Sequence, residues 1–96
     1  MNNTHVSIDS YGNYSSSNYG AHSLRVAVGN LNLYFSYKTV IAFQNGTGLR
    51  VSENCWGPTT GKHLNWIDKG NKKARLPREQ FERELSELLK THALTV

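Results

Sequence analysis

Residues 24–37 read LRVAVGNLNLYFSY, and this stretch decides the fold. Its first half alternates apolar side chains with others, because Arg25 and Ala27 separate Leu24, Val26 and Val28. A period of two is typical of a strand whose faces meet different surroundings. Gly29-Asn30 then supplies two residues that tolerate a positive φ, which predicts a tight hairpin.

The chain after this turn keeps one parity through residue 43, which predicts one shared sheet face. The residues concerned are Leu31, Leu33, Phe35, Tyr37, Thr39, Ile41 and Phe43. No Gly or Pro interrupts residues 31–44. The sequence therefore leaves open whether this stretch is one long bent strand or two strands broken near Tyr37-Lys38. A turn at residues 45–48 and a further short strand at 49–53 follow.

The first twenty residues combine a short strand around Val6 and Ile8 with a segment rich in Ser, Asn, Gly and Tyr. We interpret this segment as a loop between two strands. The alternative is an arm whose rings stack on bases or fill a partner's groove, using Tyr11, Tyr14 and Tyr19.

The C-terminal part predicts a helix over residues 77–91. Pro77 suits the first helical position, and one apolar stripe follows at helical spacing: Phe81, Leu85, Leu88 and Leu89. We therefore expect an α+β fold, an antiparallel sheet of about four or five strands with one amphipathic helix packed on one face. Residues 1–96 form a single domain in this interpretation, divided into segments 1–20, 21–54, 55–68, 69–76 and 77–91.

The charge is unevenly distributed along the chain. Residues 1–78 hold nine basic and three acidic residues, a balance of +6, whereas residues 79–96 have a balance of −2. A basic body attracts phosphate backbones or an acidic protein surface. No apolar run reaches the ~20 residues of a membrane helix, and the N-terminus does not resemble a signal peptide. The single Cys55 fits a reducing compartment.

Residues 56–66, WGPTTGKHLNW, are the densest polar and aromatic stretch. Only three residues separate Gly57 from Gly61, and a histidine follows Lys62, so the pattern is not a phosphate-binding P-loop. We expect Thr59 or Thr60 to cap a helical turn from residue 61 to 68. Two interpretations stay open for the stretch: a hydrogen-bonded structural corner, or a ligand-facing site formed by Lys62, His63 and Asn65.

Catalytic chemistry finds little support in the sequence. Cys55 with His22 or His63 is a poor nucleophile–base candidate, and a buried structural cysteine is the better interpretation. The spacing of Cys55 and His63 does not match a zinc site. We expect no catalytic residues, no metal and no cofactor.

Three segments, NYGAHSL, YFSYKTVIAF and WGPTTGKHLNWI, resemble a family of short uncharacterised proteins found largely in bacteriophages and mobile elements. The first family pattern, Ser-Tyr-x-Thr-x-(Ile/Val)-Ala, falls here on Ser36, Tyr37, Thr39, Ile41 and Ala42. The second, Thr-Thr-x-x-His-x-Asn, falls on Thr59, Thr60, His63 and Asn65. The resemblance covers most of residues 19–67 and implies a phage or mobile-element origin and a binding or regulatory role, not a reaction.

The sequence as a whole predicts a small non-enzymatic binding protein that uses a basic face to bind nucleic acid. The expected contact residues are Lys62, His63, Asn65, Trp66, Lys69, Lys72, Lys73 and Arg75. The alternative is a phage-type modulator that binds an acidic host protein. Either would act in the cytoplasm of the host cell, without a membrane.

Overall fold

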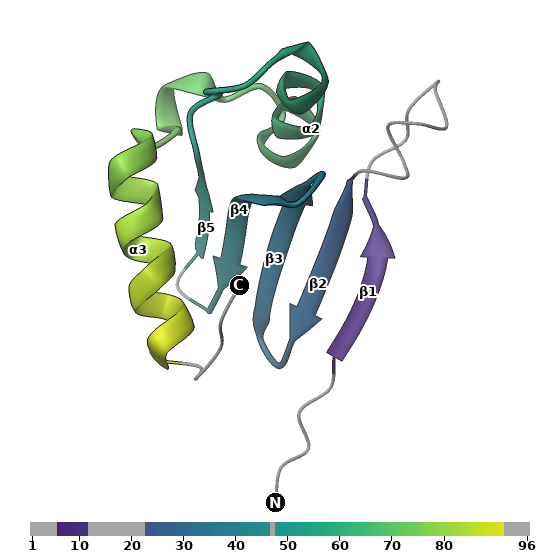
Figure 1. The fold of residues 1–96 in the computed structure, drawn as a ribbon, viewed down its shortest axis with the longest axis vertical. Coiled ribbons are helices and arrows are strands. Elements are labelled where there is room, and N and C mark those ends of the chain that lie inside the picture. The colour runs from purple at the N-terminus through teal and green to yellow at the C-terminus, as the bar shows by residue number, and fades with distance from the viewer. Residues whose placement is uncertain (1–5, 12–22, 47, 92–96) are drawn as a thin grey trace, which may run out of the picture.

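The computed structural model describes residues 6–11, 23–46 and 48–91. Five antiparallel strands lie side by side in chain order, and α3 packs on one face of the sheet (Figure 1). The expected α+β fold is confirmed. The elements are β1 (Val6–Ser10), β2 (Leu24–Val28), β3 (Leu31–Ser36), β4 (Thr39–Asn45), β5 (Gly48–Val51), α2 (Pro58–Asp68), a 3₁₀ turn η1 (Lys72–Ala74) and α3 (Arg78–Thr91).

The predicted hairpin at Gly29-Asn30 joins β2 and β3. Gly29 has a φ of 60°, a conformation that glycine adopts without steric penalty. The register pairs Val28 with Leu31 and Val26 with Leu33. On its other side β2 pairs with β1, and the exposed Arg25–Asp9 ion pair across these strands raises the pKa of Arg25. Residues 12–22, with Tyr14 and Tyr19, lie outside the described residues.

Residues 31–44 form two strands, joined by a turn at Tyr37-Lys38. Tyr34 pairs with Ala42 but Phe35 pairs with Val40, so Ile41 is an extra residue in the ladder. Such a bulge shifts the alternation of side chains between faces. Our prediction that residues 31–43 share one face is therefore wrong: Ile41 and Phe43 belong to different clusters.

The sheet thus carries a core on each face. One cluster packs the apolar stripe of α3 against the sheet, with Phe81 fully buried 5.4 Å from the Phe43 ring. The other cluster places Leu64 of α2 against Tyr11, Tyr34 and further buried residues: Ile41, Ala42 and Val51. Figure 1 shows α2 lying across the end of the sheet where β3 turns into β4.

The helix α2 begins earlier than we expected and without a threonine cap. Gly57 is its N-cap, with no side-chain cap hydrogen bond, and Pro58 opens the first turn. Pro58 needs no N–H partner at that position, so one capping bond is unnecessary. The predicted capping role of Thr59 and Thr60 is wrong, because both lie inside the helix and Thr60 Oγ1 bonds Ser36 instead.

The segment after α2 is not a fully solvated linker. Arg75 forms an ion pair with Asp68 at 2.7 Å, and the two side chains are only 6% and 7% exposed. Leu76 then bridges to Ser52 in parallel register. The helix α3 starts at Arg78, whose backbone N–H donates to the Glu53 carboxylate. Cys55 is exposed, so our expectation of a buried structural cysteine is wrong.

Candidate functional site

Two of the three sequence segments that carry the family resemblance meet in space. Ser36 Oγ, at the end of β3, lies 2.7 Å from His63 Nδ1 and 2.9 Å from Thr60 Oγ1, both on α2. All three side chains are buried. A serine–histidine pair is a possible nucleophile and base, but burial and the second bond to Thr60 favour a structural tie between sheet and helix.

Tyr37 follows Ser36 in an unusual backbone conformation. Its φ is 57°, in the left-handed region that non-glycine residues adopt at a cost of roughly 1–2 kcal/mol. Its ring lies 6.3 Å from the His63 ring and remains 50% exposed. Strained residues of this kind concentrate at binding and catalytic sites, so Tyr37 is the first indication of function here.

A small pocket opens beside this cluster. Its volume is about 280 Å³, and its lining combines aromatic walls with hydroxyl groups: Ser36, Tyr37, Thr39, Ile41, Trp56 and Thr60. We call it the Tyr37 pocket. Ligand sites are typically apolar concavities with a few polar groups that fix orientation. The Tyr37 pocket has that composition, at a size suited to one planar ring system rather than to a large ligand.

Trp56 forms one wall of the Tyr37 pocket and is 39% exposed. The Arg78 guanidinium lies 4.9 Å from its ring centroid, a distance typical of a cation–π contact. Arg78 also donates to the Val40 carbonyl at 3.1 Å and to the Glu82 carboxylate at 3.2 Å. The Arg78 cation, held by a β4 carbonyl and an α3 carboxylate, therefore lies against the Trp56 ring.

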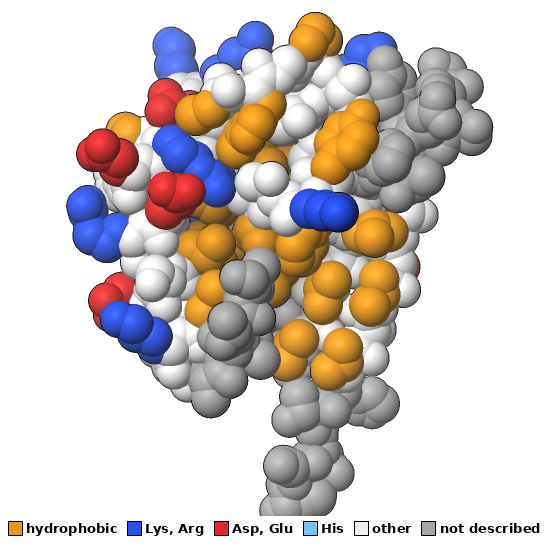
Figure 2. All heavy atoms as spheres, viewed as in Figure 1, with side chains coloured by type: hydrophobic (Ala, Val, Ile, Leu, Met, Phe, Trp, Pro, Cys, Tyr) orange, Lys and Arg blue, Asp and Glu red, His pale blue; other side chains and the backbone are white. Residues whose placement is uncertain are grey.

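A second surface lies on α2 and the segment after it. Lys62 and Trp66 are exposed one helical turn apart, so they share one side of α2. Lys69 is exposed at the C-cap, directly after the helix. Lys72 and Lys73 are exposed in η1. Figure 2 shows Lys and Arg side chains along the upper edge of the molecule, where Figure 1 places α2 and η1. We call Lys62, Trp66, Lys69, Lys72 and Lys73 the basic face.

The local charge balance makes this face strongly positive. Residues 54–78 contain six basic residues and one carboxylate, Asp68. Asp68 pairs with Arg75 inside the protein, so its charge does not oppose the lysines of the basic face. The four glutamates near the C-terminus lie on α3 and not on the elements that carry the basic face.

Three residues from the expected contact set lie elsewhere. His63 is fully buried and Arg75 is nearly so, which leaves neither side chain on the surface. Asn65 is exposed, but its Oδ1 accepts a hydrogen bond from Arg75 at 2.9 Å. These side chains position the helix and η1, and we leave them out of the proposed contact surface.

Tyr11 is a core residue and not a stacking platform. It is 3% exposed, and its hydroxyl donates to the Phe35 carbonyl at 2.9 Å. Its ring packs near those of Tyr34, His63 and Trp66, with centroids 5.4, 6.0 and 5.5 Å away. The prediction that Tyr11 stacks on a partner is therefore wrong. The Ser, Asn and Gly residues beside Tyr11 in the sequence suggested a loop and gave no sign that its ring is buried.

Sequence reasoning assigned no function to the side chains of the Tyr37 pocket. Ser36, Tyr37 and Thr39 were identified only through the family resemblance, and Trp56 only as an aromatic residue beside the turn. The one available signal was that two polar patterns recur in order along the chain. Their contact depends on how α2 crosses the sheet, which no local pattern specifies.

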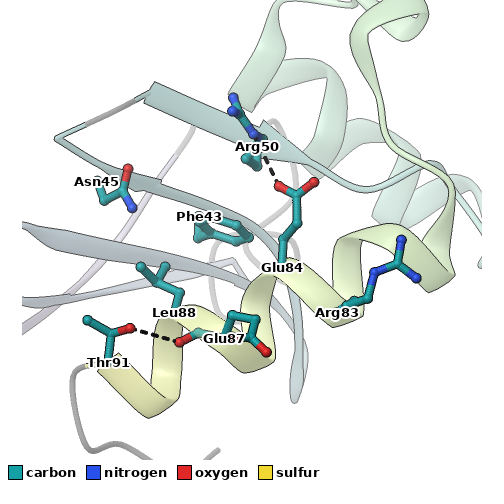
Figure 3. A pocket seen from close by; sticks show the side chains of 8 residues that line it. All are labelled: Phe43, Asn45, Arg50, Arg83, Glu84, Glu87, Leu88 and Thr91. Atoms are coloured by element: carbon teal, nitrogen blue, oxygen red, sulfur yellow. Dashed lines mark hydrogen bonds and ion pairs between the residues drawn. The ribbon is translucent and has the colours of Figure 1, made fainter.

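A larger pocket of about 580 Å³ lies between β4, β5 and α3 (Figure 3). Phe43 and Leu88 form its apolar part. Its charges are mixed, because Arg50 donates to Glu84 at 3.3 Å while Arg83 points away from the apolar floor. No set of polar groups converges on one point there, so the Tyr37 pocket and the basic face remain the better candidates.

No helix in the described part of the chain combines the length and apolar character needed to cross a membrane. Comparisons with curated proteins and with solved structures found no match. A family model does match, and it covers residues 6–83. The chain therefore belongs to DUF8033, a family of unknown function.

Proposed function

We propose that this protein binds nucleic acid through the basic face. The observation that carries the proposal is an exposed tryptophan, Trp66, with exposed Lys62 one helical turn before it and exposed Lys69 at the C-cap of α2. Lysines hold phosphates, and an aromatic ring between them offers a surface on which a base stacks. Lys72 and Lys73 extend the same charge beyond the end of α2.

Binding of this kind is electrostatic and largely independent of sequence. Phosphate contacts set affinity and orientation without reading the bases. The four glutamates of the C-terminal region, all on α3, repel a phosphate backbone, which restricts binding to the side of α2 and η1. The proposal therefore specifies which side of the protein faces the nucleic acid.

The test is fluorescence anisotropy with labelled oligonucleotides over a series of salt concentrations. The variant Lys72→Gln/Lys73→Gln removes two charges from the basic face. The variant Arg83→Gln/Lys90→Gln removes two charges from α3, so both variants lower the net charge from +4 to +2. Each phosphate contact contributes about 0.7–0.9 to the slope of log K against log salt.

We expect the basic-face variant to bind more weakly and to lose roughly 1.4–1.8 of that slope. The α3 variant keeps the parent slope. Equal losses in both variants indicate attraction to net charge alone and contradict the assignment of the face. A parent protein that shows no salt-dependent binding contradicts the proposed function.

A second candidate function, binding to a protein, is favoured by an apolar strip on the sheet. Val6 and Ile8 of β1 are 60% and 64% exposed, and they pair directly with Val28 and Val26 of β2. Figure 2 shows hydrophobic side chains gathered over β1 and β2. Contiguous apolar surface of this kind marks many interaction sites. Capture of a host protein that survives nuclease treatment and is lost in Ile8→Glu supports this candidate.

The origin and location of the protein are part of the same proposal. The resemblance of residues 19–67 to phage and mobile-element proteins supports an origin there, and nucleic acid or an acidic host protein as partner suits action in the host cytoplasm. Expression timing during infection or element transfer tests this part independently of any binding assay.

A further inference from the structure

We infer that the nucleic acid is single-stranded and that one unpaired base enters the Tyr37 pocket. This inference rests on the proposed function and specifies its ligand. Three aromatic side chains are substantially exposed among the described residues, and all border α2 or the turn beneath it: Tyr37 at 50%, Trp56 at 39% and Trp66 at 47%.

Exposed rings distinguish single strands from duplexes. In a duplex the base faces are already stacked on one another, so a protein ring has nothing to stack against. In a single strand every base presents a free face, and stacking is tolerant of sequence. Three exposed rings in one region therefore favour an unpaired strand, whereas lysines alone do not discriminate.

Two of the three rings, those of Tyr37 and Trp66, are connected through the interior of the protein. Tyr37 contacts His63, His63 contacts Tyr11, and Tyr11 contacts Trp66, with centroids 5.5 to 6.3 Å apart. Buried His63 and Tyr11 thus support exposed Tyr37 and Trp66 from below. Side chains packed in this way lose less freedom when a ligand binds, which reduces the ordering that association requires.

The Tyr37 pocket adds a place where a base is enclosed. Tyr37 and Trp56 supply flat walls, and Ile41 contributes a fully buried aliphatic side chain. The Ser36 and Thr60 hydroxyls in the lining already bond each other, and Ser36 also bonds His63. The half-buried Thr39 therefore offers the more accessible hydroxyl, which both donates and accepts hydrogen bonds. Planar walls with such a polar group between them match a nucleobase, which carries donors and acceptors along its edge.

Cations border the pocket on the side of the Tyr37 turn. Lys38 is exposed next to Tyr37, and Arg78 stands against Trp56. Glu82 accepts a hydrogen bond from Arg78 and offsets part of its charge, so Lys38 is the better phosphate contact. A nucleic-acid strand that runs from Lys38 across the Tyr37 pocket to the basic face meets cations at both ends.

The test compares a labelled single strand of about 12 nucleotides, within the usual range of site sizes, with the duplex of the same sequence at the same salt concentration. Trp66→Leu and Tyr37→Asn each remove one platform, and Trp66→Phe keeps a ring. Ser86→Ala is the control, because Ser86 is exposed on α3 and belongs neither to the rings nor to the basic face.

We expect the single strand to bind at least tenfold more tightly than the duplex. Trp66→Leu and Tyr37→Asn each weaken single-strand binding roughly 5- to 150-fold, the range for losing one base stack. Trp66→Phe keeps most of the parent affinity, and Ser86→Ala binds as the parent does. Base stacking is also read directly, as quenching of tryptophan fluorescence when the single strand binds the parent protein.

Two outcomes overturn the inference and are distinguishable. Duplex binding as tight as single-strand binding, with both platform variants unchanged, contradicts the ligand assignment but leaves the proposed function standing. Absence of binding to either form contradicts the proposed function and the inference together.

Discussion

Ser36 Oγ and His63 Nδ1 lie 2.7 Å apart inside the protein, although 27 residues separate them along the chain. With the bond from Ser36 Oγ to Thr60 Oγ1, this contact fastens α2 to the end of β3. The groups are buried, so they depend on one another rather than on bulk water. The Ser36 hydroxyl therefore connects, through its hydrogen bonds, the two segments that line the Tyr37 pocket.

We expect Ser36→Ala to lower the free energy of unfolding by about 1–3 kcal/mol, because buried polar atoms of His63 and Thr60 lose a partner. Equilibrium unfolding in urea measures the change. Ser86→Ala is the matched control, since Ser86 is exposed on α3, and its effect is within about 0.5 kcal/mol. Equal effects of the two substitutions contradict the role of the Ser36 bonds.

The buried Arg75–Asp68 pair gives a second stability prediction. We expect Arg75→Met to destabilise the fold by about 3–5 kcal/mol, because it leaves a buried carboxylate without its partner. The control is Arg50→Met, which breaks the Arg50–Glu84 pair, whose side chains are 46% and 35% exposed. An exposed pair contributes about 0–1 kcal/mol. We therefore expect Arg75→Met to lower the urea midpoint of unfolding much more than Arg50→Met does.

The double variant Arg75→Met/Asp68→Asn sharpens this prediction. Removing the carboxylate charge as well restores part of the lost stability, because no uncompensated charge remains buried. The expected coupling between the two sites is about 0.5–3 kcal/mol. Strictly additive effects of the single substitutions contradict a direct interaction between the two side chains.

Tyr11 yields a prediction that separates core from contact surface. Tyr11→Phe keeps the ring and removes the hydrogen bond to the Phe35 carbonyl. We expect a loss of about 0.5–1.5 kcal/mol in unfolding free energy and unchanged affinity for nucleic acid. Weakened binding by a variant that unfolds like the parent contradicts the placement of Tyr11 in the core.

The sheet and the C-terminal helix were predictable because their signals are local. Gly29 and Asn30 specify the first hairpin, and the spacing of Phe81, Leu85, Leu88 and Leu89 specifies the helix. The break at Tyr37-Lys38 was not predictable. A tyrosine occupies a position where glycine usually marks the turn, and surrounding contacts hold it there.

The candidate site was predictable only in part. Charge and aromatic content pointed to Lys62, Trp66 and Lys69, which are all exposed on α2 or at its C-cap. Arg75 looked like another surface cation, because its burial depends on the chain reversing after Asp68 at Gly70, where φ is 80°. Tertiary contacts of this kind leave no periodic trace in a sequence.

The last prediction concerns the strain at Tyr37. Asparagine adopts the left-handed conformation more readily than tyrosine does, and the Tyr37 ring is half exposed. We therefore expect Tyr37→Asn to leave the unfolding free energy within about 1 kcal/mol of the parent value, or to raise it. The same protein preparation loses affinity for the single strand, measured by anisotropy.

If the Tyr37 ring contacts a ligand, Tyr37→Asn therefore weakens binding without lowering the stability of the fold. The fold tolerates the substitution because relief of backbone strain offsets the lost contact with the His63 ring. A drop of more than about 2 kcal/mol, the size expected from loss of core packing, contradicts this account. It means that the ring supports His63 and that the strain is retained for the fold.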